Sequence, residues 1–109
     1  MKLSEATPEF ILKVIEERSD ALLAADELAA KLDADLKAWE ALTALAHRDS
    51  GMSMAEAEKR VRAHEDWAEK YLSLQEAHAA AARAKRDYQR ATIATDLWRS
   101  ERATARVVN

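Results

Sequence analysis

The stretch that decides the fold is HRDSGMSMAE, residues 47–56. It holds Gly51, the single glycine of the chain, between two long segments of helix-forming residues. Glycine often ends a helix, because it adopts the left-handed backbone conformation without steric penalty. Ser53 and Glu56 then form a capping box, in which each side chain bonds the other residue's free backbone N–H. The stretch predicts a helix that ends near residue 49 and a new helix that begins near residue 54.

The start of the first helix is marked upstream by three consecutive residues. Thr7 is a good N-cap, Pro8 suits the first helical position, and Glu9 complements the positive end of the helix dipole. Neither proline nor glycine follows before Gly51. We therefore expect one helix over about 8–49, roughly 60 Å long at 1.5 Å per residue.

A second break is predicted close to His64. Glu65 and Asp66 stand just ahead of an amphipathic segment that begins at Trp67, which is the pattern of a fresh helix start. We expect a short helix over about 54–62 and a long helix over about 65–106. One unbroken helix from residue 54 onward is the alternative.

Both long segments carry apolar residues at alternating steps of three and four, the spacing of a coiled-coil seam. In the first helix these positions are Ile11, Ile15, Arg18, Leu22, Ala25, Ala29, Leu32, Leu36, Trp39 and Thr43, of which Arg18 and Thr43 are polar. In the last helix they are Trp67, Tyr71, Leu74, Ala77 or His78, Ala81, Ala84, Tyr88, Ala91, Thr95 and Trp98. A short connection makes the two helices antiparallel neighbours. The predicted fold is all-α, a single domain over 1–109: an antiparallel coiled-coil helical hairpin with a short helix at its tip.

The register of this hairpin is predicted by folding the chain at the glycine turn. Positions whose numbers sum to about 113 then face each other, so Trp39 faces Leu74 and Ile15 faces Trp98. A shift of one heptad is the natural competing register, because it returns every seam residue to the seam.

A second apolar pattern, called here the leucine stripe, consists of Leu12, Leu23, Ala34 and Leu45. These residues recur every 11 positions, about three helical turns, and so share one face roughly opposite the seam. A two-helix hairpin cannot bury both sides of its first helix. We expect burial in a homo-oligomer, a dimer that forms a four-helix bundle. Isolated surface leucines and docking of a different protein are the alternatives.

Composition sets the class of protein and its compartment. The chain has 109 residues, 34% of them charged, and no cysteine, so disulfides and thiolate chemistry are excluded. No apolar run approaches the ~20 residues that span a bilayer, and no secretory signal pattern opens the chain. We expect a cytoplasmic protein without membrane contact.

The residues that usually carry catalysis or bind cofactors are not arranged for either task. A single glycine leaves no phosphate-binding loop. His47, His64 and His78 lack the spacing of helical metal pairs, although His47 and His64 could approach each other near the turn. Carboxylates are plentiful, but a thin hairpin offers no pocket to perturb their pKa values. We expect a protein that is not an enzyme and that binds neither a metal nor a cofactor.

Charge is distributed unevenly along the chain. Residues 1–49 carry 6 basic and 11 acidic side chains, and residues 83–109 carry 7 basic and 3 acidic ones. The basic segment holds two arginine triplets at helical spacing: Arg83, Arg86 and Arg90, then Arg99, Arg102 and Arg106. Such stripes can track nucleic-acid phosphates, and Tyr88 and Trp98 could stack on bases. The favoured interpretation is packing, with both aromatics in the seam and the arginines paired with Asp20, Asp26 and Glu27 of the first helix.

The segments MSMAEAEKRVRAHEDW (52–67) and DLWRSERATAR (96–106) resemble a loose family of small helical phage and prophage proteins, over residues 30–106. The second break, marked by Asp-Pro in that family, falls at His64-Glu65 here. The resemblance implies a role beside phage replication and recombination genes, in the cytoplasm of a bacterial host. We therefore expect a self-associating accessory or adaptor protein. Direct nucleic-acid binding through the arginines, or inhibition of a host defence protein, are the alternatives.

Overall fold

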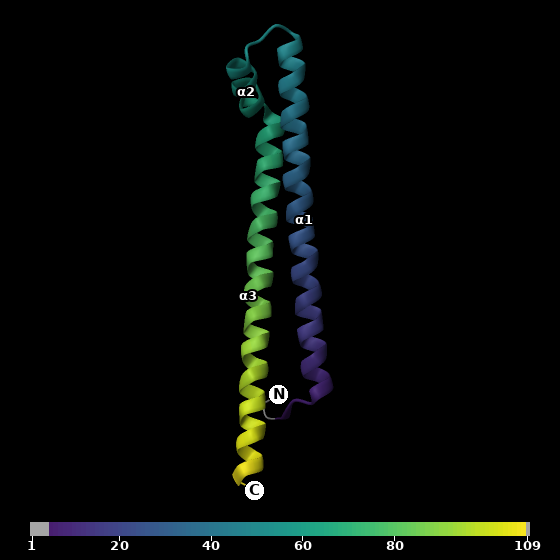
Figure 1. Cartoon of the computed structure of the whole chain (residues 1–109), viewed down its shortest axis with the longest axis vertical. Helices are drawn as coiled ribbons and strands as arrows, with labels where there is room; N and C mark the ends of the chain where they lie inside the picture. The colour runs from purple at the N-terminus through teal and green to yellow at the C-terminus, as the bar shows by residue number, and fades with distance from the viewer. Residues whose placement is uncertain (1–4, 109) are drawn as a thin grey trace. The chain divides into compact units, whose positions relative to one another are not determined.

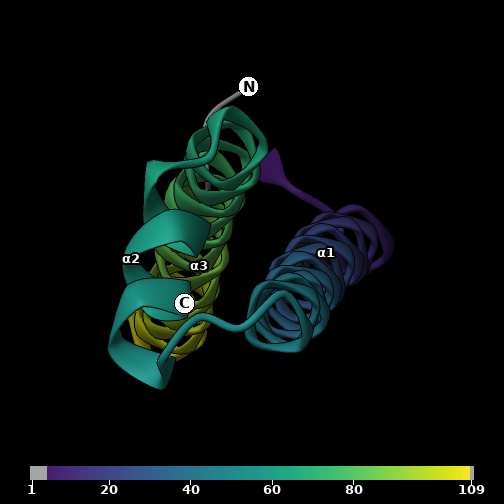
Figure 2. The ribbon, with the colours of Figure 1, turned by 90° about the horizontal axis from the view of Figure 1, so that it is seen from above.

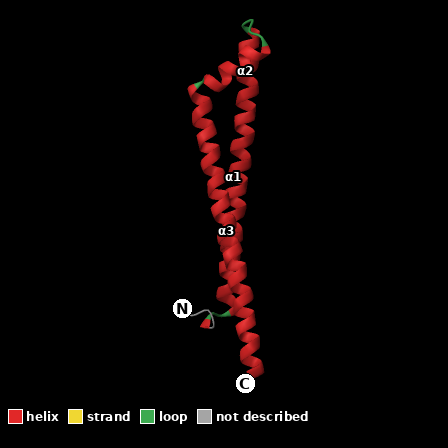
Figure 3. Cartoon of the chain, turned by 90° about the vertical axis from the view of Figure 1, so that its left-hand side faces the viewer, coloured by secondary structure: helices red, strands yellow, loops and turns green. Residues whose placement is uncertain are grey.

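The computed structural model describes the backbone of residues 5–108 and the side chains of residues 5–105. Three helices account for nearly all of this part of the chain: α1 (Pro8–Asp49), α2 (Met54–Ala63) and α3 (Glu65–Val108). Figure 3 shows helix almost throughout, and no strand occurs in the described range. The predicted all-α class and the predicted break near residue 64 are both confirmed. None of the described helices has a stretch long and apolar enough to cross a membrane.

The start of α1 follows the capping pattern of the sequence. The Phe10 backbone N–H donates to the Thr7 hydroxyl oxygen at 3.1 Å, and the Ile11 N–H donates to the Thr7 carbonyl at 3.1 Å. The Thr7 side chain thereby satisfies the Phe10 N–H, one of the groups that a helix leaves free at its N-terminus, and the Ile11 bond is the first regular bond of the helix.

The end of α1 is a Schellman motif built on Gly51. This glycine has a φ of 99°, in the left-handed region. Its N–H donates to the Arg48 carbonyl at 2.9 Å, and the Met52 N–H donates to the His47 carbonyl at 3.3 Å. The chain then crosses to α2 (Figure 2), where the Ser53 hydroxyl accepts the Glu56 N–H at 3.2 Å. That bond confirms the Ser53 half of the predicted capping box.

The break between α2 and α3 is a single extended residue. His64 has φ −74° and ψ 139°, which ends α2. Its carbonyl accepts the Trp67 N–H at 3.2 Å, and its Nδ1 accepts the Asp66 N–H at 3.1 Å. The His64 side chain therefore acts as the N-cap of α3.

Replacing His64 with Ala is expected to lower the free energy of unfolding by about 1 kcal/mol, the usual effect of removing an N-cap acceptor. His64→Asn is the matched control, since an asparagine oxygen can accept the same Asp66 N–H. Urea unfolding followed by circular dichroism measures both variants. A His64→Ala variant as stable as the asparagine variant would contradict the capping role.

The chain divides into two compact units. Unit 1 comprises Met1–Ala24 and Ala81–Asn109, and unit 2 comprises Ala25–Ala80. In each unit a segment of α1 lies beside a segment of α3, and in unit 2 the short helix α2 joins them (Figure 1). Small residues dominate both cores. The buried side chains are Ala29, Leu36, Ala57, Val61, Leu74 and Ala77 in unit 2, and Ala6 and Ala81 in unit 1.

The burial pattern follows the predicted seam closely. Arg18 and Tyr71 are the two predicted seam positions that are exposed, and Ala77 rather than its neighbour His78 is buried. All other predicted seam residues of both helices are buried or half-buried. The three-and-four spacing therefore identifies the inward faces of α1 and α3 correctly.

The predicted register, in contrast, is wrong by about one heptad. In unit 2, Leu32 and Leu36 line one groove with Ser73 and Glu69. In unit 1, the Trp98 indole Nε1–H donates to the carbonyl of Ala6 at 3.1 Å, whereas the predicted register places Trp98 opposite Ile15. Facing positions in both units sum to about 105 instead of 113. The three-and-four spacing could not distinguish the two registers, because a shift of one heptad leaves every seam residue on the seam.

Candidate interaction surfaces

The leucine stripe lies on the exposed surface of α1. Leu12, Leu23 and Leu45 are 58%, 59% and 57% exposed, and Ala34 is also exposed. A single leucine with more than half of its surface exposed to solvent is common in folded proteins. Leu12 and Leu23 lie in unit 1 and Leu45 in unit 2, and each unit leaves its own members of the 11-residue repeat uncovered.

Several exposed apolar residues lie outside the stripe, and the sequence-based prediction missed them. Besides the seam residue Tyr71, these are Phe10, Leu28 and Leu42 on α1, Met54 on α2, and Leu72, Ile93 and Leu97 on α3. Their exposure was predictable in principle, because none occupies a seam position. Only Ile93 and Leu97 lie one turn apart on one helix, at i and i+4, where two side chains touch the same partner.

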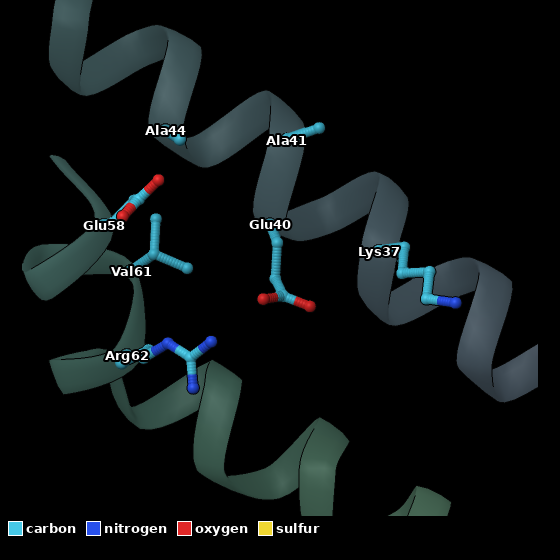
Figure 4. A pocket seen from close by; sticks show the side chains of 7 residues that line it. All are labelled: Lys37, Glu40, Ala41, Ala44, Glu58, Val61 and Arg62. Carbon is cyan, nitrogen blue, oxygen red and sulfur yellow. The ribbon is translucent and has the colours of Figure 1, made fainter. Parts of the chain in front are cut away.

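A groove between α1 and α2 in unit 2 has a volume of about 420 Å³. Figure 4 shows it lined by Lys37, Glu40, Ala41 and Ala44 from α1, and by Glu58, Val61 and Arg62 from α2. Small apolar side chains face charged ones of both signs across it. The pKa of the Lys37 ammonium is raised by a 2.9 Å hydrogen bond to the Asp33 carboxylate and by the charge of Glu40.

An aromatic cluster fixes the α2–α3 junction of unit 2. The Trp39 ring meets His64 edge-to-face at 5.4 Å, and Trp67 stacks on Tyr71 at 5.0 Å. The guanidinium of Arg62 lies 5.7 Å from the centre of the Trp67 ring, a cation–π contact. The Trp67 Nε1–H is buried and has no acceptor among the described residues. These contacts hold three helical segments together around His64, and we assign them a structural role.

The histidines are not gathered into a metal-binding group. Among the described side chains of residues 5–105, no three His, Asp or Glu are placed to hold one metal ion. From the sequence, His47 and His64 could approach each other near the turn. In the structure the Nδ1 atom of His64 accepts the Asp66 N–H instead.

The arginines of α3 are exposed but do not form one continuous track. Arg83, Arg86 and Arg90 are exposed, as are Arg99 and Arg102, and the Arg106 side chain lies outside the described residues. Arg90 and Arg99 are nine residues apart, which is about two and a half turns, so the two triplets occupy opposite faces of the helix. Arg102 covers the Trp98 ring at 5.3 Å. A nucleic-acid strand could follow one triplet or the other, but not both along a straight path.

The interpretation that these arginines pair with the acidic first helix is not supported within unit 1. Among the described arginines of this unit, Arg90 alone has an ion-pair partner, Asp87 of its own helix at 4.0 Å. Asp20 of α1, the predicted partner in unit 1, forms no ion pair with them. The reason is the phase of the helix: Arg83, Arg86 and Arg90 share a face roughly opposite the covered residues of α3. Asp26 and Glu27 belong to unit 2.

Trp98 is occupied by contacts within unit 1. Its indole N–H is bonded to the Ala6 carbonyl, and one ring face lies under Arg102. Tyr88 is half-buried on the same side of α3. Both aromatics therefore serve packing in this structure, as the favoured interpretation of the sequence expects.

No protein-family model matches the chain, and comparison with curated proteins and with solved structures finds no similar protein. The proposed function therefore rests on the exposed surfaces of the helices.

Proposed function

We propose that the protein is a non-enzymatic helical adaptor that self-associates through the leucine stripe of α1. The observation that carries this proposal is the exposure of Leu12, Leu23 and Leu45 at one helical phase. Burying the exposed part of one such side chain contributes about 1 kcal/mol. Several together offset a substantial part of the loss of freedom on association.

The thin core supports the same proposal. The buried side chains of the described residues are alanine, valine and leucine, and no large aromatic residue is fully enclosed. Small single cores supply little stability, and small helical proteins often add to theirs by oligomerising. A coiled-coil seam between α1 and α3, and a dimer in which two hairpins form a four-helix bundle, are parts of this proposal. Its setting, from the resemblance to phage and prophage proteins, is phage DNA replication or recombination in the bacterial cytoplasm.

Leu23→Glu is the variant that tests the proposed stripe. We expect wild-type protein to show a mass above the 12.2 kDa of one chain in light scattering, increasing with concentration. We expect Leu23→Glu to shift that equilibrium toward the single chain, because a carboxylate would enter an apolar contact. Leu28→Glu is the matched control, since Leu28 is 50% exposed on the same helix at a different phase. Wild-type protein with the mass of one chain at every concentration would overturn the proposal.

Direct nucleic-acid binding is the second candidate function. The observation that favours it is the exposed triplet of Arg83, Arg86 and Arg90, which has no partner on α1 within unit 1. Binding through phosphates falls steeply with salt. Titration of labelled single-stranded and duplex DNA at several salt concentrations therefore tests this candidate directly.

A further inference from the structure

Unit 1 carries a basic and apolar surface on α3, called here the basic face. It consists of Arg83, Arg86, Arg90, Ile93 and Leu97, which follow one another at steps of three and four. Ile93 and Leu97 are 60% and 56% exposed, and the three arginines are exposed beside them. These spacings place all five on one face of the helix, away from the half-buried Tyr88 and Thr95.

Unit 1 also carries an acidic and apolar surface on α1, called here the acidic face. It consists of Leu12, Glu16, Ser19, Asp20 and Leu23, all exposed. Leu12, Glu16, Ser19 and Leu23 follow at steps of four, three and four, the same spacing as Arg86, Arg90, Ile93 and Leu97. On the acidic face the two leucines stand on either side of Glu16 and Asp20, and on the basic face Ile93 and Leu97 follow the arginines. Each surface therefore combines two apolar side chains with charge, of opposite sign on the two helices.

The two faces cannot satisfy each other within one chain. Each is centred away from the covered residues of its own helix, so the two lie on opposite edges of unit 1, and of the basic face Arg90 also lines a groove with Val14 and Arg18 of α1. The absence of an ion pair between Asp20 and the arginines of the basic face agrees with this separation. Apart from the Arg90–Asp87 pair within α3, the charged side chains of the two faces have no ion-pair partner among the described residues, and their apolar side chains are exposed.

We propose that the basic face of one copy binds the acidic face of a second copy. This inference rests on the proposed self-association, names the surfaces that carry it, and replaces the two-fold four-helix dimer of that proposal with a contact between α1 and α3. Charge complementarity favours this contact over packing of α1 on α1, which would bring Glu16 and Asp20 of both copies together. Because the two faces lie on opposite edges, the contact is heterologous, and its repetition produces a ring or a chain of copies rather than a two-fold dimer.

Two charge-reversal variants test the contact. Arg83→Glu/Arg86→Glu makes both faces acidic, and Glu16→Lys/Asp20→Lys makes both faces basic. Each variant alone is expected to weaken self-association in sedimentation velocity by about tenfold or more, a change of about 1.4 kcal/mol. An equimolar mixture of the two is expected to associate again, because each acidic surface then meets a basic one.

Lys85→Glu/Arg99→Glu is the matched control. It makes the same change of charge on α3 within unit 1, at exposed residues that lie off the basic face. It is expected to associate nearly as wild type does. The mutated side chains are exposed, so all variants should keep wild-type helicity in circular dichroism, which separates lost association from lost folding.

The outcomes separate this inference from the function on which it rests. Wild-type protein that remains a single chain overturns both. Wild-type protein that associates while Arg83→Glu/Arg86→Glu associates equally well overturns the α1–α3 contact and leaves self-association through α1 standing. Failure of the mixture to associate also overturns the contact. If the arginine variant loses binding of labelled DNA but keeps self-association, the basic face serves nucleic acid and the inference is wrong.

Discussion

Leu74→Ala is expected to lower the free energy of unfolding by about 2–5 kcal/mol, the range for a leucine truncated in a packed core. Leu74 is 5% exposed and is one of two buried leucines in unit 2. The other buried residues of that unit are alanines and one valine, apart from Leu36. Short side chains on rigid helices cannot move to fill the space that a leucine leaves, so the cavity should persist.

Urea unfolding followed by circular dichroism measures this loss as a lower midpoint with an unchanged slope. Leu72→Ala is the matched control, because Leu72 is 60% exposed and stands two residues earlier on the same helix. Its effect should stay within about 0.5 kcal/mol. Equal effects at the two positions would contradict the inward face assigned to α3.

Trp98→Ala is expected to lower the free energy of unfolding by about 2–3 kcal/mol, less than the ~3–5 kcal/mol for a fully buried aromatic residue. The Trp98 side chain is half-buried, so part of its surface stays in water in the folded chain. The variant loses ring contacts, the bond from Nε1–H to the Ala6 carbonyl, and the cation–π contact with Arg102. The Ala6 carbonyl then lacks its partner, which adds a desolvation penalty.

Trp98→Phe separates these contributions. It keeps an aromatic ring for packing but removes the indole N–H, so we expect it to lower the free energy of unfolding by about 1 kcal/mol. Thermal and urea unfolding at a single low protein concentration keep self-association from masking the difference. If the Trp98→Ala variant is as stable as wild type, the Trp98 side chain does not contribute to packing and is available to stack on a base.

Much of the fold was predictable from the sequence because its signals are local. Thr7, Gly51 and Met52 mark helix ends through bonds to residues three to five positions away, and the structure contains those bonds. The break at His64 was predicted from the acidic pair that follows it. That the imidazole itself caps α3 was not, because histidine is seldom read as a capping residue.

The register and the charge pairing were not predictable in the same way, because they depend on how distant segments meet. A seam of alanines repeats too evenly to distinguish one heptad from the next. The decisive contacts are few and specific, namely Trp98 with Ala6 and Trp39 with His64. The arginine pairing followed from the wrong assumption that both triplets flank the seam.

The candidate surfaces were predicted in part. The leucine stripe is visible in the sequence as an 11-residue repeat, and the structure places its members on the exposed surface of α1. The basic face was recognised only as a row of arginines. Its apolar part, Ile93 and Leu97, becomes significant once the structure leaves both exposed beside Arg90. The α1–α2 groove has no counterpart in the sequence, since it depends on where α2 lies.

The three tryptophans are divided between the units, with Trp39 and Trp67 in unit 2 and Trp98 in unit 1. The intrinsic fluorescence of the chain therefore contains a separate signal from each unit. Trp98→Phe leaves emission from unit 2 alone, and a variant with phenylalanine at positions 39 and 67 leaves emission from unit 1 alone. Comparing their denaturation curves would reveal whether one unit unfolds while the other is still folded. Coincident curves would mean that the unfolding of the two units is coupled through the alanine-rich positions at their boundary.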